Sequence, residues 1–235
     1  MNNFFGLFAK IIGPVLALIY TLVKNYGVSI IILTFLIRLL LIPLYSKQMK
    51  YTAKMSEIQP VIKDIQTRYA NNKEKMNEEM QKIYQQYGVS PTSGCLPMLI
   101  QMPIIFGLFM LLRQPLTYMT APEMVTAVHE GFFWIPDLCQ PDPWILPILA
   151  GITTYFTFSV NSGNDATGMT NSMKYFYPVL IFLIGRSFPA GLALYWAVGN
   201  LFTIIQNLYF NKQRKNDAIK AAAEAEVIKK RKAEE

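Results

Sequence analysis

The stretch IIILTFLIRLLLIP, residues 30–43, is apolar apart from Thr34 and a single arginine, Arg38. It lies in an apolar run, 28–45, close to the roughly 20 residues that a helix needs to cross a bilayer core of about 30 Å. Similar runs follow at 93–113, 143–160, 174–188 and 189–210. They leave no room for a conventional soluble core. The sequence therefore predicts an all-α polytopic membrane protein with five transmembrane helices.

Arg38 is the residue that points to a function. It lies about nine residues, or roughly 13 Å along a helix, from Lys47, the first basic residue beyond the run. A guanidinium at such depth costs at least about 2.5–3.5 kcal/mol. None of the five runs contains an acidic residue to pair with it. We expect water to lower the cost, in a cavity open to the cytoplasm; the alternative is an arginine that reaches the lipid headgroups.

Further polar residues in the predicted spans extend this hypothesis. Thr34 lies one turn from Arg38 on the same face of its helix. Each of the others, taken alone, is more typical of a hydrogen bond between packed helices, but together they predict one polar groove. They are Gln101, Thr153, Thr157, Asn200 and Gln206. Arg113 and Arg186, near the outer ends of their spans, are interpreted as reaching the headgroups.

The distribution of charge predicts the orientation in the cell membrane. The net charge of +7 arises largely from 46–92 and 211–235, whereas 114–142 contains no lysine or arginine. By the positive-inside rule the first two segments and the loop 161–173 are cytoplasmic, and 114–142 is extracytoplasmic. The N-terminus is then outside and the C-terminus cytoplasmic. The tail carries Lys212, Arg214, Lys215, Lys229, Lys230, Arg231 and Lys232.

The N-terminal segment, 1–27, leaves two interpretations. Residues 4–23 are apolar enough to span, but Lys10 and the pair Gly13-Pro14 interrupt them. We favour a helix that lies in the outer interface over a sixth span. A signal peptide is not expected, because no basic residue precedes the apolar run.

The segment 46–92 predicts a cytoplasmic helical hairpin. Its first arm has a heptad spacing of apolar residues, and Asn71-Asn72 ends the pattern before a second arm. The seams are Met55, Ile58, Ile62, Ile65 and Tyr69, then Met76, Met80, Ile83 and Tyr87. Pro60 is expected to kink or restart the first arm. A simple connector needs only a few residues, so we expect the hairpin to receive partners through Lys54, Lys63, Arg68, Lys73 and Lys75.

No enzyme is visible in the sequence. It lacks a nucleophile elbow, a P-loop and paired carboxylates within a span. Cys95, Cys139 and His129 are too far apart to predict a metal site, and nothing indicates a cofactor or a small-molecule substrate. Two other classes stay open: a small transporter or channel, and a structural subunit of a membrane complex. The first would be expected to show internal repeats, which are not evident.

Several motifs resemble those of the YidC-type membrane insertases, in their short, single-domain bacterial form. They are TFLIR at 34–38, KMSEIQP at 54–60, GCLPMLIQMP at 94–103 and FPAGLALYW at 188–196. They occur in the family's order and cover nearly the whole chain. Two positions depart from the family pattern: threonine stands at Thr157 where glutamine is frequent, and Arg186 stands where apolar or small residues are usual.

The resemblance implies a groove that is open to the cytoplasm and the lipid but sealed outside. Arg38 would make this groove positive, and Thr34 and Trp196 would contact incoming segments. The hairpin and the basic tail would serve substrate reception and ribosome docking. The implied partners are nascent membrane proteins, the lipid bilayer, the ribosome and the general translocon.

Overall fold

The computed structural model describes residues 2–90, 96–119, 121–161 and 168–234, and over these residues the chain forms helices and no strand. The all-α prediction is confirmed. The helices are α1 (Asn2–Val23), α2 (Tyr26–Leu40), α3 (Ile42–Arg68), α4 (Lys73–Gln86), α5 (Leu96–Arg113), α6 (Pro115–Tyr118), α7 (Glu123–Ala127), α8 (Ile145–Asn161), α9 (Gly168–Gly185) and α10 (Ala190–Glu234).

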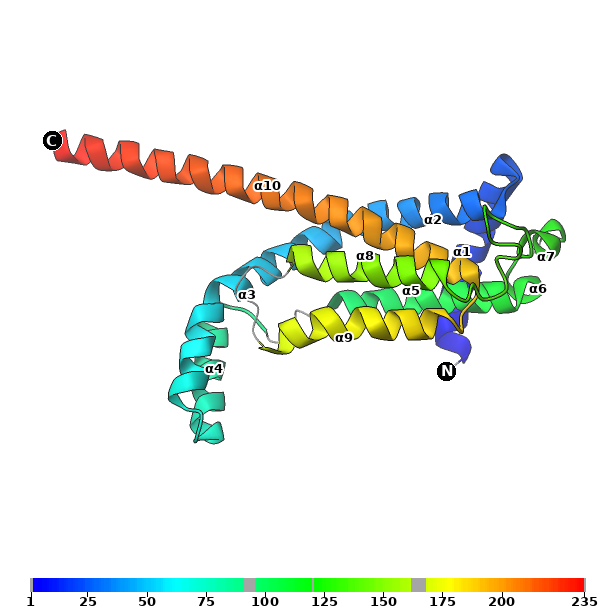
Figure 1. The fold of residues 1–235 in the computed structure, drawn as a ribbon. Helices are drawn as coiled ribbons and strands as arrows, with labels where there is room; N and C mark the ends of the chain where they lie inside the picture. Colours follow the sequence, from blue (N-terminus) through cyan, green and yellow to red (C-terminus); the bar gives the residue numbers. More distant parts are fainter. Residues whose placement is uncertain (1, 91–95, 120, 162–167, 235) are drawn as a thin grey trace.

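Five helices lie side by side as a bundle (Figure 1): α2, α5, α8, α9 and the first half of α10. Within it, α10 packs between α8 and α2, and α9 packs on α8. The α3–α4 hairpin and the second half of α10 leave from one end of the bundle, which we call the hairpin end. Helices α6 and α7 cover the opposite end, which we call the loop end.

Helix α1 runs without a break through Gly13-Pro14, so the expected interruption is wrong. A Cβ at Gly13 would lie 2.4 Å from the carbonyl oxygen of Tyr118, and glycine therefore permits close packing at this point. Figure 1 shows α1 running steeply across the bundle near the loop end, and whether it lies in the interface stays a prediction. Residues Phe4–Val23 are also long and apolar enough to span a membrane.

The predicted span 28–45 is not one straight helix. Helix α2 ends at Leu40, and α3 begins at Ile42 after a bend of 57°. Pro43 lies in the first turn of α3 and has no N–H for the carbonyl of Leu39, which explains the break. Arg38 is in the last turn of α2. Because the chain bends between Arg38 and Lys47, the depth of roughly 13 Å expected from a straight helix does not apply.

Other boundaries also differ from the apolar runs. Helix α9 begins at Gly168, six residues before the predicted 174, and ends at Gly185. A single helix, α10, runs from Ala190 to Glu234 and so joins the predicted span 189–210 to the described part of the predicted tail. The apolar parts Gln101–Arg113, Ile145–Val160 and Ser172–Gly185 are each shorter than 18 residues. The number of spans therefore stays a prediction.

The hairpin has its own small core, as expected from the first arm. Ile58 and Ile62 are buried in it with Val89, and the partly buried Met55, Met80, Ile83 and Tyr84 pack against them. Helix α3 continues unbroken through Pro60, so the expected restart there is wrong. Pro60 is on the exposed side of α3, where water can bond the freed carbonyl of Ser56.

At the end of the second arm, the residue that packs into the hairpin core is not the predicted Tyr87. Tyr87 is exposed, and Tyr84 takes its place in the core. Gly88 adopts a φ of 60°, and the Val89 N–H donates to the carbonyl of Tyr84 at 3.0 Å. This is a Schellman motif at the C-terminus of α4, and it packs Val89 against Tyr84.

The loop end of the bundle is closed by the segment between α5 and α8. Leu138, fully buried, accepts through its carbonyl from the Gly191 N–H at 2.9 Å, where α10 begins. The Glu130 carboxylate accepts from the Tyr26 N–H at 2.8 Å and from the Tyr20 hydroxyl. These bonds satisfy N–H groups that the first turns of α10 and α2 leave free. The loop thereby ties α1, α2 and α10 together.

Asp142 caps the start of α8 at this end. It accepts from the N–H groups of Trp144, Ile145 and Leu146 at 3.0–3.1 Å, and from Trp134 Nε1 at 3.1 Å. Burial alone would raise the pKa of this carboxyl, but the four hydrogen bonds favour the charged form, and the pKa is lowered. Asp142 therefore stabilises the fold as a carboxylate.

Replacing Asp142 by alanine should lower the free energy of unfolding by about 1–2 kcal/mol at neutral pH. The lowered pKa places this stabilisation above the ordinary pKa of an aspartate, and it is lost as the pH falls through the folded-state pKa. Thermal unfolding in detergent, followed by tryptophan fluorescence at several pH values, measures it. Glu123→Gln is the control, because its ion pair with Lys24 is exposed and worth little. An Asp142→Ala variant with wild-type stability would contradict this role.

Candidate functional site

Arg38 lies inside the bundle, and no carboxylate of the described residues pairs with it. The residue is only 6% exposed, and its Nη1 donates to the hydroxyl of Tyr45 at 3.0 Å. Within the described part of the chain, the guanidinium donates no other hydrogen bond, and its buried Nε has no partner. On α10, Gly199 faces it so closely that a Cβ there would lie 2.5 Å from Nη2. The arginine is therefore a buried, uncompensated cation.

The sequence predicts that Thr34 and Gln101 line a groove with Arg38. In the structure each of them is hydrogen-bonded to a different residue. Thr34 is fully buried and donates its hydroxyl to the carbonyl of Ile30 at 2.7 Å, within its own helix. Gln101 donates from Nε2 to the hydroxyl of Tyr195 at 2.8 Å, which links α5 to α10. Neither residue is in a hydrogen bond with Arg38.

Three other predicted residues, Thr153, Trp196 and Asn200, meet Thr154 in a hydrogen-bonded cluster between α8 and α10. We call these four residues the α8–α10 cluster. The Asn200 carboxamide lies 2.8 Å from Thr154 Oγ1 and 3.2 Å from Thr153 Oγ1. Turned with its oxygen toward α8, it also accepts from Trp196 Nε1 at 3.2 Å. This arrangement is typical of polar contacts that hold membrane helices together.

The same face of α10 continues toward the hairpin end with groups that lack partners. Gln206 and Asn207 follow Gly199 and Asn200 by seven residues, two helical turns further along. Their amide nitrogens are buried and unpaired, as are Arg38 Nε and Gln48 Oε1 on α3. Buried polar atoms in folded proteins are nearly always bonded to protein or water. Most of the buried unpaired polar atoms of the described chain thus lie toward the hairpin end, and the Tyr26 hydroxyl at the loop end is a further one.

The remaining predicted residues lie apart from Arg38. Thr157 is partly buried and donates to the carbonyl of Thr153 in its own helix at 2.9 Å. The basic side chains of the hairpin are exposed, and Arg68 pairs with Asp64 at 2.6 Å. The exposed ones are Lys54, Lys63, Arg68, Lys73 and Lys75. On the tail Lys212 is exposed, while the side chains of Arg214, Lys215, Lys229, Lys230, Arg231 and Lys232 lie outside the described part.

Sequence reasoning missed the residues that enclose the guanidinium. Tyr45 stands seven residues after Arg38, a spacing that keeps two residues on one side of a helix and was available as a signal. Gly199 and Tyr195 carried no comparable signal, because only the packing of α10 against α2 and α5 brings them to Arg38 and Gln101. Among the described residues no group of three or more His, Cys, Asp or Glu could hold a metal ion.

Comparison with known proteins identifies the class of this bundle. Residues 18–217 match the family described as 60Kd inner membrane protein. A membrane protein insertase YidC of Caldanaerobacter subterraneus subsp. tengcongensis is 38% identical over 209 residues, covering 88% of this chain and 95% of the relative. Membrane protein insertase YidC 1 of Listeria monocytogenes is also 38% identical, covering 89% of this chain and 73% of the relative.

A solved structure agrees with this relationship. The crystal structure of an active YidC insertase, with its first transmembrane domain resolved, superposes with a TM-score of 0.66 at 29% identity. The match covers 81% of this chain and 43% of that chain. The fold and the sequence together define a helical membrane protein of the insertase class. The chain belongs to the 60Kd inner membrane protein family, the family of the YidC insertases.

Proposed function

We propose that this insertase receives hydrophobic segments in a polar, positively charged groove, open to the cytoplasm and the lipid, and releases them into the bilayer. The observation that carries the proposal is the buried Arg38 guanidinium with no carboxylate partner in the described chain. The unpaired groups of Gln206 and Asn207 would extend the groove toward the hairpin end. The bonds at the loop end support a seal on the outer side.

Magnitudes indicate why an incoming acidic group would be drawn to Arg38. Holding the guanidinium at depth costs at least about 2.5–3.5 kcal/mol. A carboxylate about 4 Å away would recover about 4 kcal/mol at an effective dielectric constant of roughly 20. The two terms are similar, so the client is held while its charge stays near Arg38 and is released when its apolar part enters the lipid. The partly exposed Trp196 would contact the client beside Arg38, and Thr34, which is fully buried, would do so where the client displaces its neighbours.

The other parts of the chain have roles that follow from their charge and position. The exposed lysines of the hairpin would contact clients at the cytoplasmic face, and the basic tail would bind the ribosome or anionic lipid headgroups. The general translocon is a further proposed partner. In this arrangement α1 lies in the outer interface, five helices span the membrane, and the C-terminus is cytoplasmic.

Reconstitution of the purified chain into liposomes tests the function directly. A client with a single span and a short acidic tail should insert, with its tail protected from protease, and empty liposomes should give no protection. Passage of ions or a small solute without client insertion would instead favour a transporter or channel. Insertion at the level of empty liposomes would overturn the proposal.

A further inference from the structure

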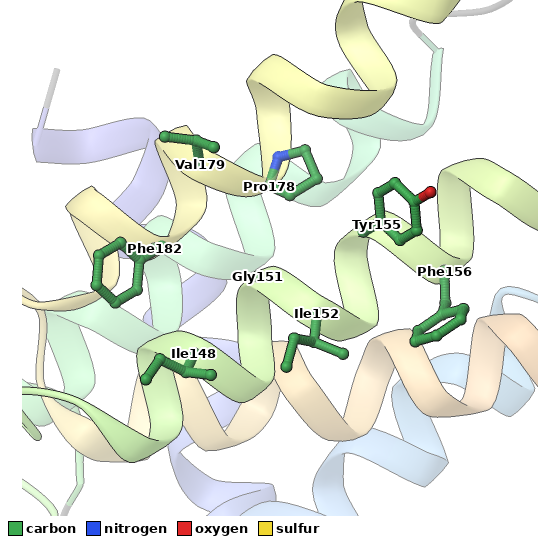
Figure 2. A pocket seen from close by; sticks show the side chains of 8 residues that line it. All are labelled: Ile148, Gly151, Ile152, Tyr155, Phe156, Pro178, Val179 and Phe182. Atoms are coloured by element: carbon green, nitrogen blue, oxygen red, sulfur yellow. The ribbon is translucent and has the colours of Figure 1, made fainter.

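An apolar groove lies on the outer surface of the bundle between α8 and α9, away from Arg38. Figure 2 shows it running from Phe182 and Ile148 at one end to Tyr155 and Phe156 at the other. Its volume is about 500 Å³, and its lining is almost wholly apolar. Val179 on its wall is 57% exposed, so the groove faces out of the protein.

A cation stands at the loop end of this groove. The Arg186 Cζ lies 4.3 Å from the ring centroid of Trp144 and 6.0 Å from that of Phe182, which lines the groove. Trp144 and Phe182 are themselves 6.5 Å apart between centroids. Aromatic stacking fixes the guanidinium at the rim and leaves its planar fork of donors free for an anion. No carboxylate is paired with Arg186 in the described chain, and the nearby Asp142 is bonded to the start of α8.

The dimensions fit one lipid leaflet. From Ile148 to Phe156 the groove follows α8 for about 12 Å, and half of a bilayer core is about 15 Å thick. A cation with tryptophan at one end and an apolar channel of this length match the head group and one acyl chain of a phospholipid. We infer that the groove binds an anionic glycerophospholipid, with its phosphate on Arg186 and an acyl chain along Ile152 and Val179.

A lipid fits this surface better than a second membrane helix. Packed membrane helices approach each other through small residues, but the exposed walls of the groove are bulky. Its one glycine, Gly151, is used inside the α8–α9 contact, where a Cβ would lie 3.2 Å from the carbonyl oxygen of Pro178. This site is separate from the client groove, and lipid binding does not depend on the proposed mode of insertion.

Lipid retention by the full chain tests the inference. The protein is reconstituted in vesicles that contain equal amounts of phosphatidylglycerol and phosphatidylcholine, and is then extracted in mild detergent. Native mass spectrometry identifies the lipids that stay bound to it. Wild type should retain phosphatidylglycerol in preference to phosphatidylcholine. Arg186→Gln should retain about tenfold less phosphatidylglycerol, the loss of one charge-assisted hydrogen bond. Val179→Trp, which fills the groove from its exposed side, should lose both lipids.

Arg113→Gln is the matched control. Arg113 is also an exposed arginine at the loop end, stacked 5.1 Å from the ring centroid of Phe109, but it does not border the groove. It should retain lipid as wild type does. Equal retention of the two lipids by wild type, or wild-type retention by Arg186→Gln, would overturn the inference. A wild-type dimer that Val179→Trp dissociates would also overturn it, because a second copy would then occupy the groove. Lys174 stands over Tyr155 at the opposite end of the groove, so a loss of phosphatidylglycerol caused by Lys174→Gln instead of Arg186→Gln would overturn it too.

Discussion

Replacing Arg38 by alanine is expected to reduce insertion of a client with an acidic translocated tail more than tenfold. Removing one partner of a buried charge pair costs about 2–5 kcal/mol, and each 1.4 kcal/mol corresponds to a factor of about ten. Arg38→Lys keeps the charge and should retain most of the insertion. Protease protection of the client tail in liposomes, or in cells depleted of the wild-type protein, measures the effect.

Loss of folding would not produce the same pattern. Arg38 is buried without a carboxylate in the described chain, so an apolar side chain of similar length should leave the fold equally or more stable. Arg38→Met should therefore unfold at the wild-type temperature or above it while failing to insert the client. Arg113→Ala, at the far end of the bundle, should insert normally. Full insertion by Arg38→Ala would show that the charge of Arg38 is not needed and would contradict the charged client groove.

The second large effect is expected at Gly199, which touches no client in the proposed mechanism but positions Arg38. A Cβ at this position would lie 2.5 Å from Nη2 and 3.1 Å from Nε. Gly199→Ala must therefore displace the guanidinium from its place beside Tyr45, although alanine favours the helix by about 1 kcal/mol. Client insertion should fall several-fold, while the thermal stability of the protein changes little.

A double-mutant cycle separates this displacement from a general disturbance of α10. Lysine at position 38 has no Nη2 atom to collide with the new methyl group. In the Arg38→Lys background, Gly199→Ala should therefore have little further effect on insertion. An equal loss in both backgrounds would mean that the methyl group disturbs helix packing rather than the cation.

Several features of this protein follow from local sequence. The lengths of the apolar runs predicted a helical membrane protein, because an isolated helix must satisfy its own backbone in lipid. The heptad spacing of Ile58 and Ile62 placed both in the hairpin core. The absence of acidic residues around Arg38 predicted an unpaired cation, and the motifs at 34–38, 94–103 and 188–196 indicated the family.

Contacts between distant helices were decided only by the tertiary structure. The periodicity of one helix shows which residues share a face, but the neighbour that meets this face depends on how all the helices cross and rotate. Gly199 against Arg38, and Asn200 against Thr154, are contacts of this kind. By contrast, the bend before Pro43 and the return of Val89 onto Tyr84 follow from local residues, the proline and Gly88. The sequence thus specified the helices and the cation, whereas the packing of α10 placed Gly199 against it and the turn from α2 into α3 placed Tyr45 within hydrogen-bond distance.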